Sequence, residues 1–139
     1  MAGELLLDTG ALVSLLDRTQ RHHRAFTSFF DSWKGPVLSS EAVLTEATHL
    51  LGGIQGGRRA CLDFFAAGGG VLVPATPASL RRSRELIEQY ASLPMDYADA
   101  TLVVLAEEVD TDLVFTTDRR DFAVYRIRGR RRFRSVPDA

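Results

Sequence analysis

Four acidic residues stand beside or within apolar patterns, where acids are unusual. They are Asp8, Glu46, Asp99 and Asp118. A carboxylate that faces a protein core costs free energy unless a hydrogen bond or a cation compensates its charge. Several carboxylates in one place also repel one another, which raises a pKa or requires a counter-ion. Oxygen ligands of this kind suit Mg²⁺ and Mn²⁺, and such ions assist hydrolysis of phosphodiester bonds. The acids therefore indicate divalent-metal chemistry and favour a nuclease.

The elements that must position these acids are short apolar strands alternating with helical patterns. Strands are predicted at residues 5–7, 37–38, 71–73 and 113–116, and a final strand or hairpin is predicted between residues 125 and 136. Helices are predicted at about 10–17, 21–33, 40–51, 58–67, 77–92 and 96–109. This alternation is typical of an α/β domain with a mainly parallel sheet. A length of 139 residues predicts one domain, residues 1–139.

Two of the acids directly follow predicted strands. Asp8 follows Leu5–Leu7, and Asp118 follows the strand at 113–116. Ligands of open α/β sheets bind beyond the carboxyl ends of the strands, so both positions suit a site. Each acid also has a simpler interpretation. Asp8 can cap the next helix, and Asp118 can open a turn at 119–123.

The other two acids lie on predicted helices. At about 100° per residue, Glu46 falls on the border of the apolar stripe of its helix, whereas Glu41 falls on the solvent face. Asp99 lies inside the inward-facing arc of the last long helix. Asp96 makes a natural N-cap for that helix. A cap pair explains Asp96 well and Asp99 less well, so Asp99 is the stronger candidate ligand.

Composition narrows the class of protein. The formal net charge is -1, so bulk charge does not indicate a nucleic-acid partner. A single cysteine, Cys61, excludes an internal disulfide and a cysteine-based zinc site. The N-terminus lacks the pattern of a secretory signal, and no apolar run approaches the ~18 residues of a membrane span. We expect a cytoplasmic protein that makes no membrane contact.

Other enzyme classes find less support. Phosphatases that use a phosphoaspartate need a second Asp two positions after the first, where this chain has Gly10. The chain has no phosphate-binding Gly-x-x-x-x-Gly-Lys-Ser/Thr loop. His22, His23 and His49 lack the spacing of a zinc enzyme.

Four segments together resemble the PIN-domain family and, within it, the VapC-like ribonuclease toxins of bacterial toxin–antitoxin pairs. They read LLLDTGALVSLLD, LSSEAVLTEATHLL, MDYADATLVVLAEE and VFTTDRRDF, in the order of the family, from Leu5 to Phe122. The resemblance assigns the four acids as a metal-binding and catalytic quartet. Asp96 is similar to an additional acid of the family, and Asp121 is a more peripheral one. Thr9 and Thr117 resemble hydroxyls that support the neighbouring carboxylates.

The resemblance also implies a fold and a function. The fold would be a three-layer α/β/α arrangement around a mainly parallel five-stranded sheet. The activity would be Mg²⁺- or Mn²⁺-dependent endoribonuclease hydrolysis, leaving a 3′-hydroxyl and a 5′-phosphate. The partners would be an RNA substrate, a small antitoxin and a second copy in a homodimer. The sequence does not select the RNA, the antitoxin or the number of metal ions. The alternative is a non-catalytic nucleic-acid-binding or scaffolding module whose acids only cap helices.

Several charged side chains and one aromatic stripe need a separate interpretation. The C-terminal arginines either hold RNA phosphates beside the acids, protect an exposed edge strand or form a simply solvated face. They are Arg126, Arg128, Arg130, Arg131, Arg132 and Arg134. Arg119 and Arg120, directly after Asp118, are possible RNA contacts. Residues expected on solvated helical faces are Arg81, Arg82, Arg84, Glu107 and Glu108. The aromatic stripe of the helix at 21–33 is expected to pack in the core rather than stack on bases.

Overall fold

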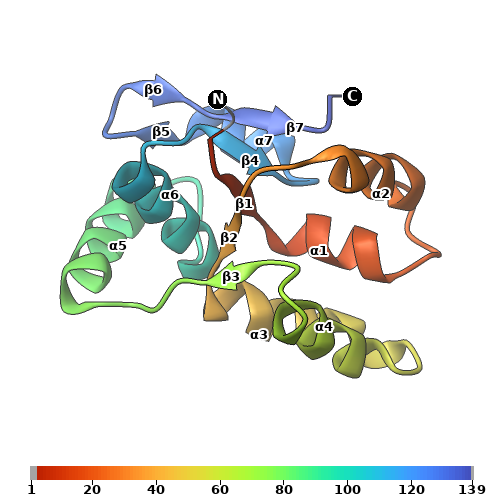
Figure 1. Cartoon of the computed structure of the whole chain (residues 1–139). Helices are drawn as coiled ribbons and strands as arrows, with labels where there is room; N and C mark the ends of the chain where they lie inside the picture. The colour runs from red at the N-terminus through yellow and green to blue at the C-terminus, as the bar shows by residue number, and fades with distance from the viewer. Residues whose placement is uncertain (1–2, 139) are drawn as a thin grey trace.

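The computed structural model describes residues 3–138, which form one twisted sheet flanked by helices (Figure 1). Its strands are β1 (Leu5–Leu7), β2 (Val37–Ser39), β3 (Val71–Leu72), β4 (Leu113–Phe115) and β7 (Arg134–Val136). The strand order is β3-β2-β1-β4-β7. All four pairings are parallel. The predicted α/β class with a five-stranded parallel sheet is therefore confirmed.

Helices cover both faces of this sheet. They are α1 (Thr9–Leu16), α2 (His23–Ser32), α3 (Glu41–Leu50), α4 (Gly57–Ala66), α5 (Pro77–Gln89), α6 (Tyr97–Val109) and α7 (Arg119–Val124). A short 3₁₀ helix, Leu51–Gly53, joins α3 to α4. Figure 1 shows α1 and α2 on one side of the sheet and α5 and α6 on the other, which gives three layers. Within residues 3–138, no helix has both the length and the apolar character required to cross a bilayer.

The core is divided by the alternation of side chains along the central strand. Leu6 packs with α5 and α6, whereas Leu5 and Leu7 pack with α1 and α2, as the period of two in a strand requires. The aromatic stripe of α2 belongs to the second cluster. The rings of Phe26 and Phe29 stack on Phe115 with centroid distances of 4.9 and 5.2 Å. The prediction that this stripe is a core feature is confirmed.

The C-terminal segment, for which the sequence predicted either a final strand or a hairpin, forms both. Strands β5 (Arg126–Ile127) and β6 (Arg131–Arg132) form an antiparallel hairpin outside the main sheet. The chain then returns as β7, parallel to β4 at the edge of the sheet. The turn predicted at 119–123 is instead the short helix α7, because Asp118 caps it and Phe122 is buried in the core.

Candidate active site

The two strand-following acids stand at neighbouring carboxyl ends of the sheet, because β1 and β4 are adjacent. Asp8 occupies the N-cap position of α1, yet its side chain makes no capping hydrogen bond. Its buried carboxylate instead accepts a hydrogen bond of 2.6 Å from the hydroxyl of Thr116. Asp118 does cap α7 by accepting from the backbone N–H of Asp121 at 3.2 Å. The capping interpretation thus accounts for Asp118 but not for the Asp8 carboxylate.

The helical acids approach the same edge from two other elements. Asp96 is the N-cap of α6, and its carboxylate accepts from the backbone N–H of Asp99 at 2.8 Å. The Asp99 side chain is half-buried and accepts a hydrogen bond of 3.0 Å from the Tyr125 hydroxyl. Glu46 is half-buried on α3, in keeping with its position at the border of the apolar stripe, and Glu41 is exposed.

Burial and neighbouring charges change the ionisation of two of the acids. Burial raises the pKa of Asp8 to about 6, the Thr116 hydrogen bond opposes this rise, and the charges of Asp118 and Glu46 add to it. Burial raises the pKa of Asp99 to about 7, and the charges of Asp96, Asp8 and Asp118 raise it further. Each of the four predicted ligands therefore acts on at least one other, in the manner of an uncompensated acidic site.

The donor set fits a divalent cation, although it is not drawn into a closed cage. Among residues 3–138, no lysine or arginine lies within the 4.0 Å of an ion pair from any of the four acids. In the same range, no three His, Cys, Asp or Glu side chains are close enough together to surround an ion. Mg²⁺ is commonly bound through one or two carboxylates and several waters, so the oxygen ligands of these acids fit the ion by their chemistry.

The hydroxyl that supports Asp8 belongs to Thr116, a residue that sequence reasoning missed. Thr116 also accepts the backbone N–H of Asp118 at 2.8 Å and so connects two of the acids. Thr117, predicted for a supporting role, is exposed. The other predicted hydroxyl, that of Thr9, is buried without a hydrogen-bond partner. The period of two could have selected Thr116, because residues 116 and 118 lie on the same side of an extended segment.

Tyr125 is the second residue that sequence reasoning missed at the site. Its hydroxyl donates to the carboxylate of Asp99 across 26 positions of sequence. Burial and the nearby Asp99 charge raise the pKa of Tyr125 far above its usual value, so it remains a hydrogen-bond donor. No local pattern indicated this contact, because Tyr125 was interpreted only as a residue of a terminal strand.

The two arginines predicted as RNA contacts differ in whether the guanidinium is free to bind a phosphate. The guanidinium of Arg119 donates to the backbone oxygens of Ser135 and Pro137, at 3.4 and 2.8 Å, and is thereby tied to the end of β7. Arg120 is exposed, and within residues 3–138 its side chain has neither an ion-pair nor a hydrogen-bond partner. Of the two, only Arg120 keeps a guanidinium free for a phosphate.

Two members of the C-terminal arginine run, Arg128 and Arg131, lie away from the acids, and whether the run contacts RNA stays a prediction. Arg128 and Arg131 form ion pairs with Asp110 at the C-terminal end of α6. Asp99 lies at the opposite end of this helix, about 16 Å away at 1.5 Å per residue. These two arginines therefore tie the hairpin to the C-terminal end of α6, away from Asp99.

Glu107 corrects another expectation, because it is not a solvated surface residue. Its side chain is only 12% exposed and pairs in a bidentate manner with Arg82, with both N–O distances at 2.9 Å. Arg82 is likewise partly buried. The reason is tertiary packing, since α5 covers this face of α6, and a single helix pattern cannot reveal its neighbour.

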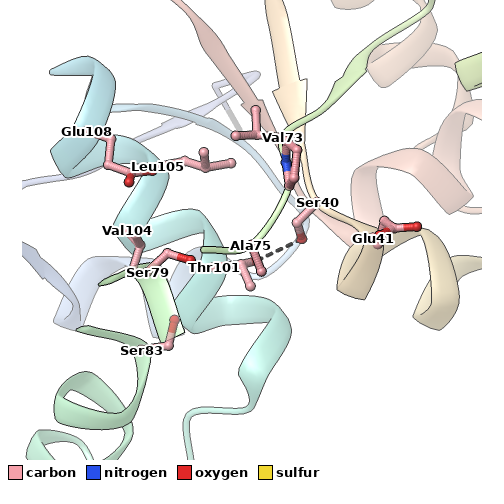
Figure 2. Close-up of a pocket in the computed structure, with 11 residues that line it drawn as sticks. Ser40, Glu41, Val73, Ala75, Ser79, Ser83, Thr101, Val104, Leu105 and Glu108 are labelled. Carbon is pink, nitrogen blue, oxygen red and sulfur yellow. Dashed lines mark hydrogen bonds between the residues drawn. The ribbon is translucent and has the colours of Figure 1, made fainter. Parts of the chain in front are cut away.

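A separate hollow of about 60 Å³ lies between the N-terminal end of α3, the segment after β3, and helices α5 and α6 (Figure 2). A hydrogen bond of 2.8 Å joins the hydroxyls of Ser40 and Thr101 at its edge. The hydroxyl-bearing residues Ser79 and Ser83 also line it. None of the four acids does, so this hollow is distinct from the acidic site.

The chain belongs to the PIN-domain family, since the sequence profile of the PIN domain matches residues 5–127. Over 135 residues it is 29% identical to ribonuclease VapC26 of Mycobacterium tuberculosis (strain ATCC 25618 / H37Rv), covering 96% of this chain and 100% of the relative. The fold is similar to the crystal structure of M. tuberculosis VapC20, a Sarcin-Ricin loop cleaving toxin. That comparison gives a TM-score of 0.72 at 18% identity, covering 84% of this chain and 91% of the other. The predicted resemblance is confirmed.

Proposed function

We propose that this protein is a metal-dependent endoribonuclease and the toxin of a toxin–antitoxin pair. The observation that supports the proposal is that Asp8 and Asp118 follow adjacent parallel strands, and that burial and neighbouring acids raise the pKa values of Asp8 and Asp99 to about 6 and 7. Membership of the PIN-domain family supports it. The similarity over nearly the whole chain to a ribonuclease supports the substrate class.

Asp8, Glu46, Asp99 and Asp118 would hold Mg²⁺ or Mn²⁺, directly or through water, with Asp96 as a less central acid. The bound ion would activate water and offset the charge that develops at the phosphodiester. The protein residues prepare the carboxylates for this role. Thr116 orients Asp8 and Tyr125 orients Asp99, and hydrogen bonds of this kind determine how metal ligands are presented.

Protonation links these side chains to the ion. Because burial raises the pKa of Asp8 and Asp99 towards neutrality, a proton competes with the cation for each carboxylate. Metal binding therefore releases protons, and affinity should increase with pH through this range. The hydrogen bonds from Thr116 and Tyr125 lower both pKa values and so favour the ionised, metal-binding form.

The partners follow from the same proposal. RNA is the substrate, a small antitoxin is the inhibitor, and two copies of the chain form a homodimer. The similarity to VapC proteins supports the RNA substrate and the antitoxin. The homodimer rests on the resemblance of the sequence to the family.

The test is cleavage of total cellular RNA by the purified protein in Mg²⁺, Mn²⁺ or EDTA. Asp99→Asn removes the ligand near the N-terminal end of α6, and Glu108→Gln, an exposed acid of the same helix, is the matched control. We expect discrete fragments that require metal, disappear in Asp99→Asn and persist in Glu108→Gln. Cleavage that survives Asp99→Asn would contradict the site, and a complete lack of metal-dependent cleavage would favour a binding module.

A further inference from the structure

A second basic feature of the chain lies in the segment that joins α1 to α2, away from the β5–β6 hairpin. The connection between α1 and α2 and the first residues of α2 carry a dense group of basic side chains, here termed the α1–α2 basic edge. Its members are Arg18, Arg21, His22, His23 and Arg24. All three arginines are exposed. The net charge of the whole chain conceals this cluster.

The only acid in the α1–α2 connection, Asp17, is held in hydrogen bonds within that connection. The Asp17 carboxylate accepts hydrogen bonds from the N–H and hydroxyl of Thr19, at 2.9 and 2.7 Å, and from the Gln20 amide at 3.0 Å. The bonds from Gln20 and Thr19 lower the pKa of Asp17, which stays ionised while it holds the turn. In the described part of the chain, no carboxylate lies within 4.0 Å of Arg18, Arg21 or Arg24.

His22 of the basic edge shares two surface hollows with residues that neighbour Asp8 and Asp118 in the chain. One open hollow of about 250 Å³ is lined by His22, Thr116, Thr117 and Arg119 among others. A second, of about 430 Å³, is lined by Gly10, His22 and Thr117 among others. His22 and Thr117 line both hollows, and Thr117 directly precedes Asp118 in the chain, although none of the four acids lines either hollow.

Gly10 and Thr117 are tightly packed against each other beside these hollows. A Cβ atom at Gly10 would lie only 2.0 Å from the Thr117 hydroxyl oxygen, so a larger residue would displace Thr117. The His22 ring packs 5.9 Å from the ring of Phe26, which anchors it over the start of α2.

We infer that the α1–α2 basic edge binds backbone phosphates of the RNA on one side of the scissile bond. This inference rests on the proposed nuclease function and specifies how its substrate is held. A cation placed between the carboxylates would neutralise only the reacting phosphate. The flanking phosphates need their own counter-charges, and unpaired arginines match phosphate geometry.

The experiment compares two pairs of substitutions that remove the same charge from opposite ends of the domain. Arg21→Gln/Arg24→Gln alters the basic edge, and Arg130→Gln/Arg132→Gln alters the β5–β6 hairpin. All four arginines are exposed, and within residues 3–138 their side chains have neither hydrogen-bond nor ion-pair partners. Thermal unfolding should be unchanged in both pairs, which establishes that each variant is folded.

Binding of a labelled single-stranded RNA is measured in EDTA, where hydrolysis is prevented, between about 50 and 200 mM salt. Loss of two phosphate contacts should reduce the slope of log affinity against log salt by about 1.4. We expect affinity to fall by about tenfold or more in the basic-edge pair, with the hairpin pair close to wild type. In Mg²⁺, the basic-edge pair should raise KM more than it lowers kcat.

The outcomes separate this inference from the nuclease proposal. Equal affinity and slope in wild type and the basic-edge pair, with normal wild-type cleavage, would overturn the inference and leave the nuclease standing. An equal loss in both pairs would also overturn it, because only the total charge would matter. Loss confined to the basic edge, in a protein that cuts no RNA, would support the surface and refute the nuclease. A wild type that neither binds nor cuts RNA would refute both.

Discussion

Replacing Asp8 by Asn should stabilise the metal-free protein, although it removes a residue of the proposed site. The Asp8 carboxyl is buried at the end of β1 and is only 5% exposed. Burial and the neighbouring acids Asp118 and Glu46 raise its pKa. An amide in its place keeps an oxygen that can accept from the Thr116 hydroxyl but carries no charge. The substitution therefore relieves the cost of a buried charge.

The magnitude follows from the pKa. Each tenfold change in proton affinity corresponds to about 1.4 kcal/mol. A pKa of Asp8 raised from 3.8 to about 6 thus corresponds to about 3 kcal/mol at a pH above both values. The buried amide has a desolvation cost of its own, so the net gain in the free energy of unfolding should be about 1–3 kcal/mol. The cost of the charge develops between the unfolded and folded pKa values and is complete above about pH 6.

The assay is chemical unfolding of wild type and Asp8→Asn in EDTA at about pH 8 and about pH 4. We expect the variant to be more stable at the higher pH and nearly equal at the lower. Asp17→Asn is the matched control at the other end of α1. Hydrogen bonds from Gln20 and Thr19 lower the pKa of Asp17, so this substitution should destabilise the protein, with a loss that fades as the pH falls below the unfolded pKa. An Asp8→Asn protein no more stable than wild type at about pH 8, or a gain independent of pH, would refute the reasoning.

Three further substitutions test other contacts of the site and the fold. Tyr125→Phe removes the hydrogen-bond donor to Asp99, so the pKa of Asp99 should rise further. The acidic limb of the cleavage pH profile should then move to higher pH, and activity near neutral pH should fall by about tenfold. Thr116→Val leaves the buried Asp8 carboxylate without its hydroxyl donor, so the free energy of unfolding in denaturant should fall by about 1–3 kcal/mol. The control Thr117→Val lies at an exposed position and should change this free energy by less than about 0.5 kcal/mol. Glu107→Gln weakens the bidentate pair with an arginine of α5 and should cost about 1–2 kcal/mol while RNA cleavage is unchanged; a large loss of cleavage would contradict its structural role.

Much of the fold could be predicted because its elements have strong local signals. Buried strands such as Leu5–Leu7 are continuous apolar runs, and the helices between them begin and end within a few residues of their predicted bounds. The C-terminal segment was harder to predict. Its strands contain only two or three residues each, and their pairing depends on distant elements. Short strands of this kind carry too little periodicity to distinguish a hairpin from a sheet edge.

The site could be predicted only in part, and the limit is physical. Helical geometry distinguished Glu46 from Glu41 because burial follows the angle around a helix. Contacts between elements have no such local signal. The hydroxyl of Tyr125 reaches Asp99, and the partial burial of Glu107 depends on the packing of α5 against α6. The basic edge was missed for a different reason, since its histidines were judged only as possible zinc ligands.

The most direct test of the proposed site is the binding of Mn²⁺, followed by electron paramagnetic resonance of the free ion. The two substitutions Glu46→Gln and Glu41→Gln lie five residues apart on α3, which is about 1.4 turns. Glu46 is half-buried near Asp8, and Glu41 is exposed. If the four acids hold the ion, wild type and Glu41→Gln will bind Mn²⁺ alike, and Glu46→Gln will bind it about tenfold or more weakly. Equal binding in all three proteins, or none in wild type, would contradict the assignment of Glu46 and its neighbours as the metal site.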